Sequence, residues 1–175
     1  MKKLMIFGVF ILAVVLILPG CSSFSPRVEV SKACPVRVDY SLSLAEMIDA
    51  GHYDWVNEDI FSYPFVAGDP SDYHGQEEVQ LYLVRFGRQI SSDDVYMELD
   101  KIDLRPATIA ELLALGAKYF RERQKHPVVA LGSILHSPDY GHVASLERYY
   151  LERHLSLYYF YPGWHYGCCF LAAPK

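Results

Sequence analysis

Seven histidines are the side chains in this chain best suited to metal binding or acid–base chemistry. His136 and His142, with Asp139 between them, fall in one short segment and could offer nitrogen and oxygen ligands to zinc. The chain contains no His-Glu-x-x-His pattern and no Cys/His knuckle, and this segment offers fewer ligands than zinc needs. We therefore expect a solvated loop here, and we predict no metal ion and no other cofactor.

The hydroxyl and carboxylate groups suggest other chemistry, but each fits a plainer interpretation. Ser133 follows a buried-type strand, yet its Ala-Leu-Gly-Ser context lacks the Gly-x-Ser-x-Gly elbow of a hydrolase nucleophile. Asp69 and Asp72 could bind calcium, but their spacing is not that of a calcium loop. No catalytic constellation emerges, so whether the chain is an enzyme stays open, with a non-enzyme favoured.

The N-terminus has the layout of an export signal. Lys2 and Lys3 precede an unbroken apolar run from Leu4 to Leu18, and a small residue follows before Cys21. As a helix this run would cover roughly 22 Å, which is short of the ~30 Å hydrocarbon core of a bilayer. We predict that residues 1–20 are a signal peptide and that the rest of the chain works outside the cytoplasm.

The end of this signal, Leu18-Pro19-Gly20-Cys21, resembles the lipobox of bacterial lipoproteins. The resemblance implies that Cys21 becomes the first mature residue and carries the lipid that anchors the protein to a membrane. In bacteria with two membranes, the Ser after the cysteine implies sorting to the outer membrane or cell surface. Pro19 departs from the family pattern, so an uncleaved signal anchor is the alternative. Residues 21–35 are expected to form a tether.

Three further cysteines are Cys34, Cys168 and Cys169. Outside the cytoplasm a disulfide from Cys34 to Cys168 or Cys169 is permitted, and it would join the two ends of the domain. Neighbouring strand residues face opposite ways, so only one of the vicinal pair could face Cys34. The alternative is three buried free thiols, and the sequence leaves both open.

Charge and length limit the class of protein. The chain carries −5, and removal of Lys2 and Lys3 leaves −7 on the mature part. Nucleic-acid binding depends largely on contacts of basic side chains with phosphate, so we expect no nucleic-acid partner. Residues 36–175 are enough for one domain with its own core.

Helix and strand patterns both occur, which predicts an α+β fold with short helices and a mainly antiparallel sheet. Capping boxes begin helices after Ser43 and Thr108, and Ser91 with Asp94 caps another. The remaining patterns predict strands at 36–40, 79–86 and 128–131, a loop around Pro138 and Gly141, and a C-terminal hairpin of 155–161 with 164–172.

Residues 104–120 and 127–133 resemble a group of uncharacterised bacterial proteins with an "LRPAT-x-x-ELLA … VALGS" core. This resemblance brings no activity with it. Arg105, Pro106, Thr108 and Glu111 also resemble, more distantly, a helix-opening segment of the C-type-lectin-like superfamily. That likeness implies a lectin-like fold, although Ala107 stands where the family has no residue. The adjacent Cys168 and Cys169 do not match the spaced catalytic cysteines of its enzymes.

Aromatic side chains near the C-terminus are the most suggestive candidates for a binding surface. A platform is predicted from Tyr158, Tyr159, Tyr161, Trp164 and Tyr166, because tyrosine offers apolar contact and a polar handle. The alternative, which we favour, is a strand buried on both faces. The sequence thus predicts a membrane-tethered binding domain with an envelope protein or glycan as ligand. An extracytoplasmic enzyme and a structural envelope lipoprotein are the other readings.

Overall fold

The computed structural model describes residues 28–119, 126–160 and 163–175. The predicted signal peptide, Cys21 and Tyr161 lie outside these ranges. No helix in the described ranges is long and apolar enough to cross a membrane. Short 3-10 helices are labelled η, and the elements follow in this order: β1 (Glu29–Val30), β2 (Cys34–Asp39), α1 (Leu44–Ala50), β3 (Trp55–Val56), η1 (Glu58–Phe61), β4 (Phe65–Ala67), η2 (Pro70–Asp72), β5 (Gln76–Arg85), α2 (Ser92–Asp100), β6 (Leu104–Pro106), α3 (Ile109–Tyr119), β7 (Val128–His136), β8 (Gly141–Tyr149), β9 (Glu152–Tyr159) and β10 (Cys169–Pro174).

Ten strands form an open sheet in the order β1-β5-β10-β7-β8-β9-β3, with β2 beside β5, β4 beside β7 and β6 beside β10. Among the strands of the described residues, only the β10–β7 and β3–β9 pairs are parallel. The predicted α+β class with a mainly antiparallel sheet is therefore confirmed. Residues 29–35, which were expected to be tether, instead provide β1 and the start of β2.

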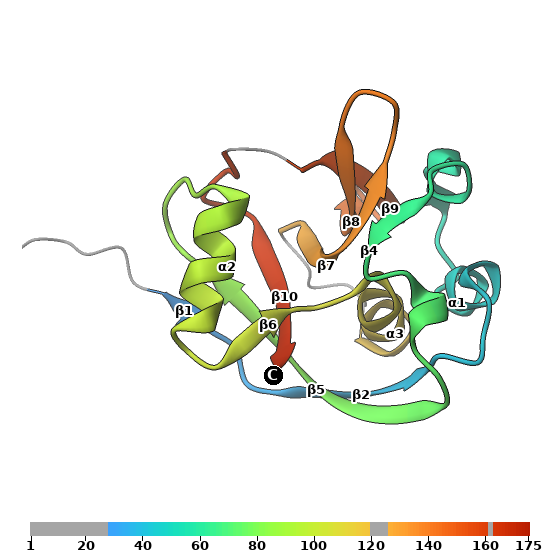
Figure 1. The fold of residues 1–175 in the computed structure, drawn as a ribbon, viewed down its shortest axis with the longest axis horizontal. Helices are drawn as coiled ribbons and strands as arrows, with labels where there is room; N and C mark the ends of the chain where they lie inside the picture. Colours follow the sequence, from blue (N-terminus) through green and yellow to red (C-terminus); the bar gives the residue numbers. More distant parts are fainter. Residues whose placement is uncertain (1–27, 120–125, 161–162) are drawn as a thin grey trace, which may run out of the picture.

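The two faces of the sheet pack against different helices. Figure 1 shows α2 and α3 on opposite sides of β10. We call the side against α3 the inner face and the side against α2 the outer face. Alternation along β7 illustrates the division, since Val128 and Ala130 join the inner core while Val129 and Leu131 join the outer one.

The capping boxes form as the sequence predicts. Ser43 and Glu46 exchange hydrogen bonds at the start of α1, where the Ser43 N–H donates to Glu46 Oε2 at 2.8 Å. At the start of α3, the Thr108 N–H donates to Glu111 Oε2 at 2.6 Å. Glu111 also accepts two bonds from Arg105, of 2.7 and 3.0 Å, and its side chain is fully buried. This ion pair, buried on the Glu111 side and 39% exposed at Arg105, joins β6 to the first turn of α3.

The predicted C-terminal hairpin is wrong. β9 pairs with β8, most of which had no assigned structure in the sequence analysis, and β10 inserts between β5 and β7. The β8–β9 turn contains no glycine, and Tyr150 takes the left-handed conformation there with φ of 56°. β7 also continues beyond Gly132 to His136, and its second half pairs with β4 as well as with β8.

Of the two alternatives that the sequence leaves open for the cysteines, the structure has free thiols. Cys34, Cys168 and Cys169 are free thiols. Cys34 lies opposite Leu81 on the β1 side of β5, while β10 pairs with the other edge and places Phe170 opposite Val84. Two strand spacings and the shift in register separate the Cα atoms of Cys34 and Cys169 by roughly 16 Å. A disulfide requires Cα atoms within about 7 Å, so this register excludes the bond.

Candidate ligand-binding pocket

An aromatic pocket of about 560 Å³ lies where β9 ends and the chain approaches β10. We call it the aromatic pocket. The side chains around it that matter for binding are His126, Tyr158, Tyr159, Trp164, His165 and Tyr166. The structure thus brings together four of the five predicted platform residues, and the fifth, Tyr161, lies outside the described residues. Volume and lining fall in the ordinary range for small-molecule sites.

Trp164 is held in place by the strand-to-helix connection before α2. Its backbone N–H donates to the Ile90 carbonyl at 2.6 Å, and its indole N–H donates to Ser92 Oγ at 2.9 Å. The indole is only 4% exposed and lies edge-on to Phe170, with ring centroids 5.7 Å apart. Trp164 therefore serves as a rigid base, with its polar atom already satisfied.

Tyr158 and Tyr166 supply the accessible aromatic surface. Tyr158 is 37% exposed and meets the Trp164 ring edge-on at 6.1 Å, while Tyr166 is 59% exposed. The favoured interpretation, a strand buried on both faces, is therefore wrong at the C-terminal end of β9. Leu155 and Leu157 remain in the inner core, as alternation requires.

A carboxylate lies behind Tyr158. Burial, together with the charge of Glu147 and a hydrogen bond to it, raises the pKa of Tyr158 well above its usual range. Glu147 Oε1 also accepts a 3.0 Å hydrogen bond from Ser145, which is fully buried. Tyr158 therefore stays a neutral hydroxyl at every physiological pH, fixed in direction by Glu147 and able to accept a hydrogen bond from a ligand.

The vicinal thiols do not form a reactive pair. Burial raises the pKa of Cys168, and it raises the pKa of Cys169 to about 11. Thiols are nucleophilic as thiolates, so both are held in their unreactive form at neutral pH. Cys168 packs against the outer core and Cys169 lies in the inner one, which agrees with the expected opposite directions of neighbouring strand residues.

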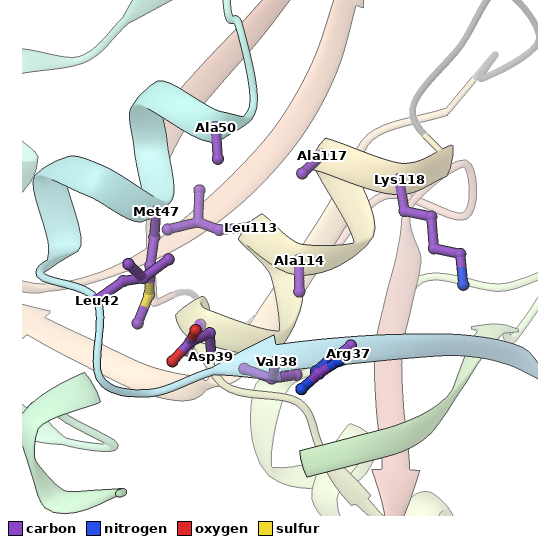
Figure 2. Close-up of a pocket in the computed structure, with 11 residues that line it drawn as sticks. Arg37, Val38, Asp39, Leu42, Met47, Ala50, Leu113, Ala114, Ala117 and Lys118 are labelled. Atoms are coloured by element: carbon purple, nitrogen blue, oxygen red, sulfur yellow. The ribbon is translucent and has the colours of Figure 1, made fainter. Parts of the chain in front are cut away.

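A second hollow, of about 400 Å³, lies between α1, α3 and β2. Figure 2 shows Met47 of α1 and Leu113 and Ala114 of α3 around it. Its charged rim is bonded within the protein: Arg37 donates to Gln76, and Lys118 Nζ donates to the Pro35 carbonyl at 2.9 Å. Because these charged groups already bond within the protein, they are poorly suited to contact a ligand, and a binding site needs a few polar groups that do so.

Ser133 and Asp69, which the sequence analysis considered for catalysis and for calcium binding, have structural roles. Ser133 Oγ accepts from the Ile109 N–H at 2.9 Å and donates to the Gly68 carbonyl at 2.5 Å, so it links β7 to the start of α3. Asp69 caps η2 by accepting from Ser71 at 2.9 Å. These contacts explain both residues without catalysis.

The histidine segment also differs from expectation. His142 is not solvated, because it is buried between the rings of Tyr63 and Tyr159 at centroid distances of 5.2 and 4.9 Å. Among residues 28–119, 126–160 and 163–175, no group of three or more His, Cys, Asp or Glu side chains could hold a metal ion.

Sequence reasoning missed Glu147, His126 and His165 as neighbours of the aromatic pocket. Glu147 lies on β8, for which the sequence analysis predicted no strand, so no face could be assigned to it. Comparisons of the chain with protein-family models, curated proteins and solved structures found no match in any of the three. The function is therefore inferred from the residues themselves.

Proposed function

We propose that this protein is an exported, lipid-anchored binding domain whose aromatic pocket holds a saccharide unit. The observation that carries the proposal is the convergence of Tyr158, Trp164 and Tyr166 on one pocket that also contains two histidines. A sugar ring has an apolar C–H face and a polar hydroxyl edge, so it suits aromatic walls that also bear polar groups.

The polar groups at the pocket suit hydroxyls rather than charges. The Tyr158 hydroxyl is oriented by Glu147, and His165 and His126 add ring nitrogens that donate or accept. Such groups can fix the orientation of a sugar whose ring rests on Tyr166. The likeness of Arg105, Pro106, Thr108 and Glu111 to a C-type-lectin-like segment agrees with this ligand class, and we include that lectin-like relationship in the proposal.

Binding is tested with full-length protein in detergent, titrated calorimetrically with saccharides from bacterial envelopes. Tyr166→Ala should weaken binding about tenfold, because one aromatic contact contributes roughly 0.5–1.5 kcal/mol beyond its area. Phe61→Ala, which removes a similarly exposed ring on η1, is the control and should bind like the native protein. Equal affinity of the native and Tyr166→Ala proteins would refute the pocket as the site.

The anchor rests on the Leu18-Pro19-Gly20-Cys21 motif and has its own test. Intact mass and membrane fractionation should show diacylglycerol on the native protein, and loss of both lipid and processing in Cys21→Ala. Retention of residues 1–20 without lipid would instead make the protein a signal-anchored domain, with Pro19 blocking cleavage.

A further inference from the structure

A second group of exposed aromatic rings lies at the far end of the β8–β9 hairpin. We call Trp55, Tyr149, Tyr150 and His154 the distal row. Their rings touch in sequence, with centroid distances of 5.4 Å from Trp55 to His154, 5.9 Å from His154 to Tyr149 and 4.8 Å from Tyr149 to Tyr150. Trp55 is 45% exposed, Tyr149 61% and Tyr150 83%. Contiguous exposed apolar surface of this kind marks interaction sites.

The distal row and the aromatic pocket share the outer face of the sheet. His154 and Tyr158 are both even-numbered residues of β9, opposite in direction to the inner-core Leu155 and Leu157. Tyr149 shares its direction on β8 with Val143, which belongs to the outer core. Four residues of strand separate His154 from Tyr158, which is about 13 Å. The two aromatic groups therefore lie in line along one strand.

Polar side chains fill the interval between them. Ser156 of β9 is partly exposed, whereas Ser145, directly opposite it on β8, is fully buried and donates to Glu147, which is opposite His154. All four alternate to the outer face. The order along the strands is aromatic, hydroxyl and carboxylate, then aromatic again, which matches a ligand with several sugar units rather than one.

The charge on this face selects against acidic polymers. Glu147 and Glu152 are on the outer side, whereas Arg148 and Arg153, which are directly opposite each other, alternate to the inner side. Arg153 donates to the Gly116 carbonyl of α3 at 2.8 Å, which fixes its direction. A ligand here meets the Ser156 hydroxyl, Glu147 and Glu152, whose carboxylate lies 3.1 Å from His154 Nε2, so this face suits an uncharged chain better than an anionic one.

We propose that the outer face from the aromatic pocket to the distal row binds successive units of a linear, uncharged polysaccharide. This inference rests on the proposed function and adds that the ligand is a polymer. An extended peptide fits less well beside the distal row, because β3 pairs with β9 at His154 and Leu155 and occupies that part of the edge.

The test is calorimetric titration of full-length protein with neutral oligosaccharides of increasing length, from a single sugar to a hexasaccharide. Affinity should rise with length. Trp55→Ala should lower affinity for the hexasaccharide about tenfold and leave the disaccharide unchanged, while Tyr166→Ala weakens both. Trp55→Phe should restore most of the loss, and unfolding curves of Trp55→Ala and the native protein should coincide.

The outcomes separate the two proposals. Binding of all lengths with equal affinity, or an unaltered hexasaccharide affinity in Trp55→Ala, overturns the extended site and leaves the pocket standing. No binding of any saccharide overturns both. A Trp55-dependent affinity for an uncharged extended peptide, with none for the sugars, would show that the occupant is a polypeptide.

Discussion

The hydroxyl of Tyr53 lies directly against the Cα of Gly116. Because Gly116 has no side chain, α3 leaves room for the Tyr53 ring, which comes from the connection between α1 and β3. A methyl group at Gly116 would overlap Tyr53 Oη, and one at Gly51, the C-cap of α1, would overlap the same ring. The guanidinium of Arg153 lies 5.2 Å from the centroid of that ring. Gly51 and Gly116 therefore allow α1, α3 and β9 to pack closely around Tyr53.

Gly116→Ala should therefore destabilise the protein by about 1–3 kcal/mol, the usual range for an overpacked core. Urea unfolding followed by far-UV circular dichroism measures the loss. The Tyr53→Phe background should recover much of it, because the overlapping oxygen is gone. If Gly116→Ala unfolds at the same urea concentration as the native protein, the contact with Tyr53 is looser than described.

Tyr53→Phe on its own should be neutral or stabilising by up to about 1 kcal/mol. The Tyr53 hydroxyl is buried and has no hydrogen-bond partner among the described residues, so its removal loses no bond. A clear loss of stability in this variant would reveal a partner for the hydroxyl.

Glu111→Ala should lower stability by about 2–3 kcal/mol, because it removes the bonds to Arg105, which is 39% exposed, and leaves the first turn of α3 without its cap. Glu46→Ala removes the equivalent residue from the exposed capping box of α1 and should lose much less. Glu111→Gln, which keeps an acceptor for the Thr108 N–H, should fall between them. Equal losses for Glu111→Ala and Glu46→Ala in urea unfolding would contradict the ion pair.

The thiol of Cys169 should make the protein less stable in alkali. Burial raises its pKa from about 9.0 to about 11, so in the unfolded chain this thiol ionises first as pH rises. Its contribution to stability is complete below pH 9 and declines towards pH 11. Unfolding midpoints across this range should fall less steeply in Cys169→Ala than in the native protein. Cys34→Ala, which keeps Cys169, should follow the native slope.

Filling the hollow of Figure 2 should stabilise the protein. Ala114 is only partly buried and lines the hollow, so Ala114→Leu should add about 0.5–2 kcal/mol by packing against Met47 and Leu113. Ala130→Leu is the opposite case, since Ala130 is fully buried in β7 and has no such space. That variant should lose about 1–3 kcal/mol. Thermal unfolding of the two variants beside the native protein measures both effects.

Local signals were predictable from the sequence, and contacts between distant segments were not. The Ser43 and Thr108 capping boxes depend on residues three apart, so they could be placed before any tertiary contact was known. Tyr158, Trp164 and Tyr166, which line one pocket, could be named as a candidate platform because they lie close together in the chain, although the sequence favoured a strand buried on both faces. The hairpin of β8 and β9 was missed because its turn at Tyr150 uses none of the glycine or asparagine signals that mark such turns.

The remaining errors share one physical cause. The expected pairing of 155–161 with 164–172 assumed that neighbouring strands pair, whereas Phe170 pairs with Val84 and Val129, far earlier in the chain. The same wrong position of the C-terminal strand made a disulfide between Cys34 and Cys168 or Cys169 seem possible. Trp55 entered no prediction as a binding residue, because only its pairing with His154 brings it to the outer face.

The position of β10 has a consequence for how the protein is made. This strand consists of nearly the last residues of the chain, yet it holds β5, β6 and β7 together in the middle of the sheet. The N-terminal and C-terminal halves of the sheet cannot join until those residues are available. If the chain is exported as proposed, N-terminus first, the sheet closes only after β10 has crossed the membrane.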